Sequence, residues 1–164
     1  MNLKQIHKGV YCLDAEYVQP GVAAIYLLEQ HGQLCIIETG TSLSLPLVEQ
    51  AIASLGLSPG DVAYIIPTHI HLDHAGGAGA LMRACPQAQL IIHPRGAAHM
   101  VDPAKLIAGT IAVYGEQNYQ RLYGEVVPVD ETRMIIADDG FSLEFNGRTL
   151  EFVDTPGHAL HHFC

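Results

Sequence analysis

One short segment concentrates side chains that bind metal ions. Between residues 68 and 74, three imidazoles and a carboxylate occupy six successive positions, and two glycines that allow a sharp backbone turn follow soon after. If His69 and His71 lie in extended backbone, they project to the same side and can reach one cation about 2.0–2.1 Å away. Asp73 and His74 are then placed to face a second cation close by.

A second cluster, at residues 154–158, reads Asp-Thr-Pro-Gly-His. It combines the end of an expected strand, a tight turn and an imidazole, which makes His158 a natural third ligand for the first metal. The alternative for His158 alone is a turn histidine that is satisfied by water. A lone histidine on a loop favours that solvated interpretation, whereas four ligand side chains directly after a buried strand favour a metal site.

The elements before this segment are mostly strands. Runs rich in β-branched and aromatic residues predict strands at Gly9 to Asp14, Val22 to Glu29 and Gln33 to Glu38, the last two joined by a tight hairpin at His31-Gly32. Ser44-Leu45-Pro46 predicts the start of a helix that ends near Leu55. The apolar run from Val62 to Ile66 predicts a buried strand, so the histidine-rich segment lies on a loop at its carboxyl end.

Strands and helices alternate after the metal segment. The pattern predicts a helix at Gly77 to Ala84, a strand at Gln89 to His93, and one or two helices in Pro103 to Tyr123 with a break near Gly115. From Glu125 onward the pattern returns to strands. Asn146-Gly147 then predicts a hairpin between Phe141 to Phe145 and Arg148 to Asp154. These elements indicate an α/β fold with helices on the outer faces of sheets.

Composition limits the partners of the chain. Its 164 residues are 49% hydrophobic, which suits one domain over residues 1–164, and its net charge of −9 without a basic cluster disfavours nucleic acid and anionic membranes. The sequence has no signal-peptide pattern and no apolar run of about 18 residues, so we expect a cytoplasmic protein. The four cysteines form no C-x-x-C pair and indicate no thiolate zinc site.

The histidine-rich segment resembles the H-x-H-x-D-H signature of the metallo-β-lactamase superfamily, here His69, His71, Asp73 and His74. Glu38-Thr39-Gly40 and the Thr-Pro-Gly-His at 155–158 follow the order of the family. The resemblance implies an αββα four-layer sandwich in which His69, His71 and His158 hold one metal while Asp73 and His74 contribute to another. Glu38 replaces the usual aspartate, which in the family supports the ligands from behind.

The resemblance also implies that family members continue beyond this length. Their second half supplies a bridging aspartate and a further histidine for the second metal. We therefore expect the chain to be the N-terminal portion of a longer domain, truncated at its C-terminus after Cys164.

The expected chemistry is metal-assisted hydrolysis. Two Zn²⁺ ions, or iron or manganese in their place, would lower the pKa of a water toward neutrality and polarise a carbonyl. Asp73 is the candidate catalytic residue, because a carboxylate within the metal loop can orient the nucleophile and move its proton. The resemblance implies a small-molecule ester, thioester or lactone as substrate, with a β-lactam as one option.

The sequence leaves two other functions open. One is the glutathione-persulfide dioxygenase branch of the same superfamily, which uses a single iron and consumes oxygen. The other is a non-catalytic metal-binding fragment whose exposed strand edges promote association. The sequence indicates no oligomeric state. Tyr114, Tyr119, Tyr123 and His93 are candidates for a pocket, but a core position is favoured for them. The roles of four further residues are left open: His99, Lys105, His161 and His162.

Overall fold

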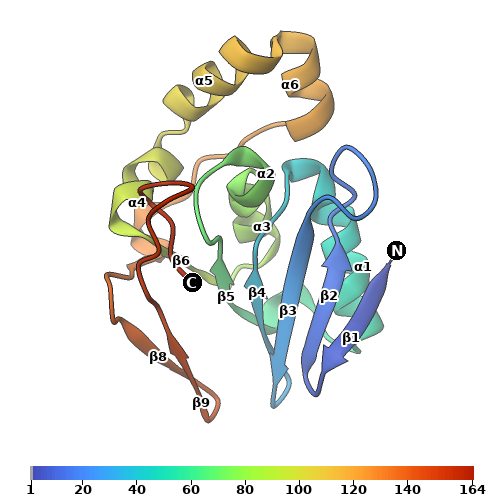
Figure 1. Cartoon of the computed structure of the whole chain (residues 1–164). Helices are drawn as coiled ribbons and strands as arrows, with labels where there is room; N and C mark the ends of the chain where they lie inside the picture. The colour runs from blue at the N-terminus through green and yellow to red at the C-terminus, as the bar shows by residue number, and fades with distance from the viewer. Residues whose placement is uncertain (1) are drawn as a thin grey trace.

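A seven-stranded sheet forms the centre of the structure (Figure 1). The computed structural model describes residues 2–164. The strands lie in chain order, with β1 to β4 antiparallel and β4 to β7 parallel. Their bounds are β1 (Leu3–His7), β2 (Val10–Asp14), β3 (Ala24–Gln30), β4 (Gln33–Ile37), β5 (Val62–Ile66), β6 (Gln89–Ile92) and β7 (Met134–Ile136).

The predicted turn chemistry is confirmed at both hairpins. Gln30 pairs with Gln33 across the turn at residues 31 and 32, whose positive φ angles of 50° and 80° suit a two-residue loop. The turn at Asn146 and Gly147 joins β8 (Ser142–Phe145) to β9 (Arg148–Glu151) with the same kind of geometry. Strand β9 ends three residues before the predicted boundary at Asp154.

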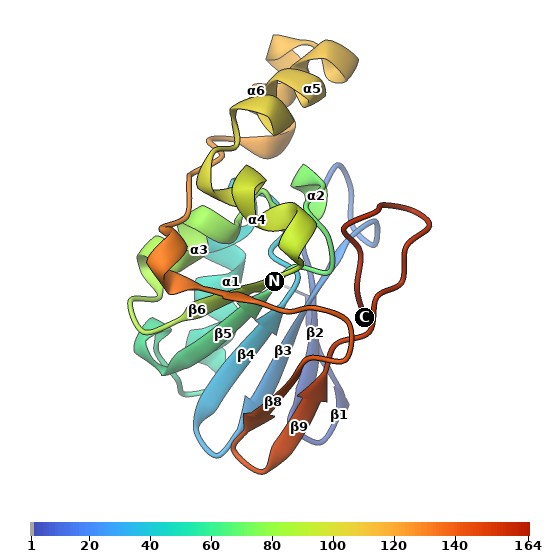
Figure 2. The same ribbon diagram turned by 90° about the vertical axis from the view of Figure 1, so that its left-hand side faces the viewer.

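Helices cover one face of the sheet, as Figure 2 shows. Alternate strand residues point to opposite faces, so Leu27 packs beneath the helices while its neighbour Leu28 packs on the other side. The helices are α1 (Leu45–Ser54), α2 (Leu72–Ala75), α3 (Ala78–Ala84), α4 (Pro94–Val101), α5 (Ala104–Tyr114) and α6 (Glu116–Tyr123), and short 3₁₀ turns are η1 (Ser42–Ser44), η2 (Pro59–Asp61) and η3 (Glu131–Arg133).

The β8–β9 hairpin lies against the opposite face of the sheet. Phe145 and Phe152 are buried there with Cys35 and Ile66 of the large sheet, and Phe163 closes the same cluster. Residues 2–164 thus build a helix layer, a large sheet and a second layer of strands. This arrangement confirms the predicted α/β sandwich.

Two helices stand apart from the sheet. α5 and α6 form a hairpin beyond α2 in both views (Figures 1 and 2). Gly115, at φ 78°, separates them where the sequence predicts a break. A small cluster that includes Leu72, Tyr119 and Tyr123 fixes the hairpin to the metal loop.

Three elements lie outside the predicted pattern. β1 carries mostly exposed residues and is held by its pairing with β2, α2 is a single helical turn in the segment predicted as a loop, and α4 begins at the Pro94 that follows β6. Each of them depends on a neighbour that local periodicity does not report. Across residues 2–164, every helix is too short or too polar to cross a lipid bilayer.

Candidate metal centre

The histidine-rich segment leaves the sheet at the carboxyl end of β5. Pro67 ends the strand, and His71 is the residue before the single turn of α2. The loop is held against the turn after β4, because the backbone N–H and the hydroxyl of Thr39 both donate to the carbonyl of His74, at 2.8 and 2.7 Å. A Cβ on Gly77 would lie 2.7 Å from the carbonyl oxygens of Thr39 and Thr41, so this close approach requires glycine.

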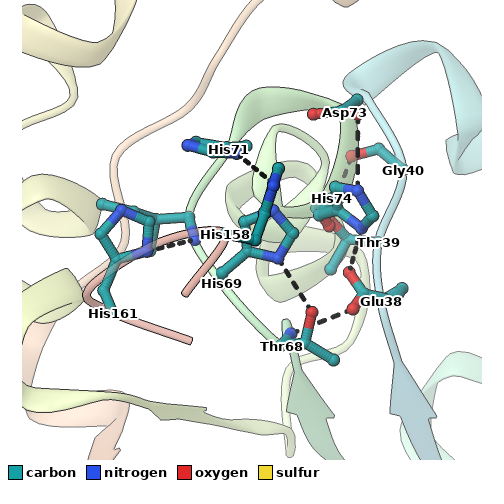
Figure 3. A network of polar contacts seen from close by, with 11 residues as sticks. Glu38, Thr39, Gly40, Thr68, His69, His71, Asp73, His74, His158 and His161 are labelled. Carbon is teal, nitrogen blue, oxygen red and sulfur yellow. Dashed lines mark hydrogen bonds and ion pairs between the residues drawn. The ribbon is translucent and has the colours of Figure 1, made fainter. Parts of the chain in front are cut away.

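Three imidazoles from two distant segments converge at this loop (Figure 3). One ring nitrogen of each of His69, His71 and His158 lies within 4.8 Å of the others. Nδ1 of His71 and Nε2 of His158 are 3.1 Å apart. Two nitrogens on one tetrahedral zinc, each about 2.0–2.1 Å from the ion, are separated by about 3.3 Å. The rings are therefore spaced as ligands of one ion.

His69 is the buried member of the group. It is 3% exposed, and its Nδ1 lies 3.0 Å from the hydroxyl of Thr68. Its Nε2 is buried without a hydrogen-bond partner among residues 2–164. Burial, with the neighbouring histidines His74 and His71 as further causes, lowers the pKa of His69 to about 3. His69 is thus a neutral imidazole with an unused nitrogen, which is the form that binds a metal.

His74 is oriented by two carboxylates. Its Nδ1 lies 3.1 Å from Oε2 of Glu38, and its Nε2 lies 3.4 Å from Oδ2 of Asp73. The hydrogen bond to Glu38 raises the pKa of His74. Glu38 is 6% exposed, and its other oxygen accepts the backbone N–H of Thr68 at 3.1 Å. Glu38, His69 and His74 also form a second group with ligand atoms within 4.8 Å.

The loop that carries His158 is tied to the metal loop by backbone contacts. Phe163 donates its N–H to the carbonyl of Thr68 at 3.1 Å, and Ile70 donates its N–H to Nδ1 of His161 at 3.3 Å. Where this loop begins, Oδ1 of Asp154 lies 3.3 Å from Nε2 of the buried His93. These contacts explain how His71 and His158, which are 87 residues apart in sequence, meet at one site.

A cavity of about 570 Å³ opens beside the imidazole group. Residues 70–74 of the metal loop and His158 form one side of its wall, and α5 with Tyr123 of α6 forms the other. A volume of this size is in the usual range for small-molecule sites, about 300–1,000 Å³. The site therefore combines ligand side chains with space for a substrate.

The structure brings all five sequence-predicted site residues to this place. Their roles as ligands, and the role of Asp73 in catalysis, stay predictions. Tyr123 lines the cavity and also packs in the helical cluster, whereas Tyr119 packs in that cluster alone. Tyr17 was not predicted: its hydroxyl lies 2.7 Å from that of Tyr123, and no motif marks this contact in the sequence. Two of the residues that the sequence left open, Tyr114 and Lys105, line the cavity. His93 contacts Asp154, His161 accepts the N–H of Ile70, and His162 contacts Thr155. His99 is half-buried.

The fold and this site define an α/β protein with a histidine-rich metal-binding pattern. The family model described as "Metallo-beta-lactamase superfamily" matches residues 18–164, so the chain belongs to the metallo-β-lactamase superfamily. The fold predicted from the resemblance is thereby confirmed. The chain is 30% identical to the N-acyl homoserine lactonase AttM of Azorhizobium caulinodans over 113 residues, which are 68% of this chain and 38% of that protein.

Other relatives cover more of the chain. A metallo-β-lactamase fold-containing protein of Sulfurisphaera tokodaii is 24% identical over 94% of this chain and 57% of its own length. Among solved structures, a HARLDQ-motif metallo-β-lactamase variant from Cronobacter sakazakii superposes with a TM-score of 0.74 and 26% identity over 99% of this chain and 57% of that one. The chain thus spans less than two thirds of the length of these proteins.

Proposed function

We propose that this chain carries the metal centre of a metal-dependent hydrolase that acts on a small-molecule ester, thioester or lactone. The observation that supports it most directly is the buried, unpartnered Nε2 of His69 beside the facing nitrogens of His71 and His158. A buried polar atom without a partner is costly in a folded protein, and a bound cation would remove that cost. The donor set of neutral imidazoles suits zinc, and also accepts iron.

A second ion would be held by Asp73 and His74. Nδ1 of His74 is occupied by Glu38, which leaves Nε2 directed toward the carboxylate of Asp73 at 3.4 Å. Both atoms suit a divalent ion, although two donors do not complete a zinc coordination sphere. We expect this position to bind more weakly than the group formed by His69, His71 and His158.

Metal ions at this site would supply an activated water and an electrophile for a carbonyl oxygen. The side chains of this chain supply orientation and proton transfer. Asp73 lines the cavity and lies next to His74, so its carboxylate is in position to accept a proton from an attacking water. Glu38 holds His74 and Thr68 from the buried side and keeps the loop in one conformation.

The bond class is supported by the named relatives. A lactonase and a β-lactamase both hydrolyse a cyclic acyl bond, and they match this chain at 30% and 26% identity. The substrate of the whole protein remains part of the proposal, since the chain covers little more than half of that β-lactamase chain and 38% of the lactonase.

The test is hydrolysis by the chain loaded with Zn²⁺. γ-Butyrolactone, p-nitrophenyl butyrate, a butyryl thioester and a chromogenic cephalosporin cover the four bond types, and His158→Ala serves as the metal-site variant. We expect hydrolysis of at least one substrate that is lost in His158→Ala and retained in His7→Ala, an exposed histidine of β1. If the chain binds metal but hydrolyses none of these substrates, the proposed hydrolase function is wrong and the non-catalytic alternative is favoured. Oxygen uptake with glutathione persulfide by the iron-loaded chain would favour the dioxygenase.

A further inference from the structure

One face of α5 lines the cavity. Leu106, Gly109, Thr110 and Val113 recur at the i, i+3, i+4 and i+7 spacing of a helix face, and all four border the space beside His71 and His158. The helix reads AKLIAGTIAVY and has no fully buried residue. A helix this apolar is ordinarily buried against a core, so its open face indicates an apolar occupant.

The polar groups on this wall are largely engaged within the protein. The hydroxyl of Thr110 donates to the carbonyl of Leu106 at 2.8 Å, and the hydroxyl of Tyr123 is paired with that of Tyr17. Lys105 is the charged residue that α5 adds to the lining, and it is exposed. The ammonium group can therefore remain in water while its apolar stem covers the wall.

Gly109 leaves the middle of this face open. A Cβ built on Gly109 meets no atom within 4 Å, and its backbone is helical, so neither packing nor φ requires glycine there. Glycine is a weak helix former, less favourable than alanine by about 1 kcal/mol in a helix interior. Its place at the cavity, where a side chain would occupy the open volume, is consistent with a binding role.

We propose that the face of α5 formed by Leu106, Gly109, Thr110 and Val113 binds the apolar acyl chain of the substrate, with the scissile carbonyl at the metal loop. This inference rests on the proposed function, and it narrows the substrate class to esters, thioesters or lactones with an apolar acyl chain. The cavity is continuous from the imidazoles to α5, so one ligand can contact both. Its apolar part would gain affinity for each methylene that leaves water.

The test compares octanoate with butyrate as probes of the zinc-loaded full chain, by isothermal titration calorimetry. Each fully buried methylene adds up to about fourfold in affinity, so we expect octanoate to bind at least about tenfold more tightly than butyrate. Gly109→Leu should reduce this ratio to about threefold or less, because its side chain occupies the middle of the face on which the acyl chain would lie. Ala108→Leu, exposed on α5 and outside the cavity lining, should keep the wild-type ratio.

Thermal unfolding shows that the variants are folded. Gly109→Leu replaces glycine with a better helix former, and Ala108→Leu exchanges two strong helix formers, so neither should lower the midpoint by more than a few degrees. Equal affinity of the wild type for the two carboxylates, or equal ratios in Gly109→Leu and Ala108→Leu, would overturn the acyl site. If the protein still hydrolyses p-nitrophenyl butyrate in either case, the proposed hydrolase function is retained and only the acyl site is rejected. Chain-length-dependent binding by a protein that hydrolyses no ester or lactone would overturn the hydrolase and not the acyl site.

Discussion

Oε2 of Glu38 lies 3.1 Å from Nδ1 of His74, at the buried side of the metal loop. This contact fixes which nitrogen of His74 remains for a ligand, because a histidine whose Nδ1–H is held by a carboxylate presents Nε2. Glu38 has a φ of 68°, an unusual value for a residue other than glycine. The surrounding loop thus maintains a strained backbone at the position that supports the metal site.

Glu38→Gln should weaken zinc binding. The substitution keeps the size of the side chain but removes the charge that pairs with His74, and loss of such supporting contacts lowers metal affinity by about 10–100-fold. Competition with a chromophoric chelator measures the change. Glu49→Gln, exposed on α1, is the matched control and should bind zinc as the wild type does. Unchanged affinity in Glu38→Gln would remove the supporting role of Glu38.

The metal-free chain should lose stability as the pH falls below about 6.5. The folded-state pKa of His69 is about 3, and the pKa values of His71 and His161 are also lowered, chiefly by burial. Between these values and 6.5 the unfolded chain binds more protons, so acid favours unfolding. His74, whose pKa is raised by Glu38, acts in the opposite direction above 6.5.

Urea unfolding at pH 7.5 and pH 5.5, with EDTA present, measures this dependence. The midpoint should be lower at pH 5.5, and the difference should shrink in His69→Gln, whose side chain does not titrate. A midpoint that rises at pH 5.5 would show that the lowered pKa values do not control the acid response.

Asp73→Ala should slow hydrolysis without removing the ion held by the three imidazoles. Asp73 lies beside His74 and outside the group of His69, His71 and His158. Loss of a general acid or base lowers kcat by about 10²–10⁴. Zinc content and kcat measured on the same preparation separate the two roles. Full activity in Asp73→Ala would eliminate Asp73 as the catalytic residue.

Arg133→Ala should destabilise the fold away from the site. The guanidinium donates to the carbonyls of Met82, Cys85 and Ala88 at 2.6–3.2 Å. It thus provides hydrogen-bond donors for carbonyl groups at the end of α3 and in the turn that follows. We expect a loss of about 2 kcal/mol in the free energy of unfolding, since bonds from a charged donor contribute about 1.5–3 kcal/mol each when buried and less at a half-exposed residue. Urea unfolding checks this, with Arg83→Ala, exposed on α3, as the control that stays near wild type.

The metal loop could be predicted from the sequence because its ligands are close together in the chain. His69 and His71 follow a buried apolar run, so their position at the end of β5 follows from local pattern alone. His158 was assigned partly from its Thr-Pro-Gly turn and partly from the family resemblance. Its approach to His71 depends on contacts made by Phe163 and His161, which no local pattern reports.

The cavity could not be predicted for a different reason. α5 is apolar on nearly every side, so periodicity gives no direction for its open face. The orientation follows from the break at Gly115 and from the packing of Tyr119 and Tyr123 against Leu72. β1 was missed because its exposed residues do not alternate as those of a half-buried strand do.

The most direct test of the metal centre is the number of Zn²⁺ ions bound per chain, measured by isothermal titration calorimetry with elemental analysis. We predict at least one tightly bound ion in the wild type and in His7→Ala, and loss of that ion in His69→Ala and in His158→Ala. A wild-type chain that is folded but binds no zinc would contradict the account, as would tight binding that survives both substitutions.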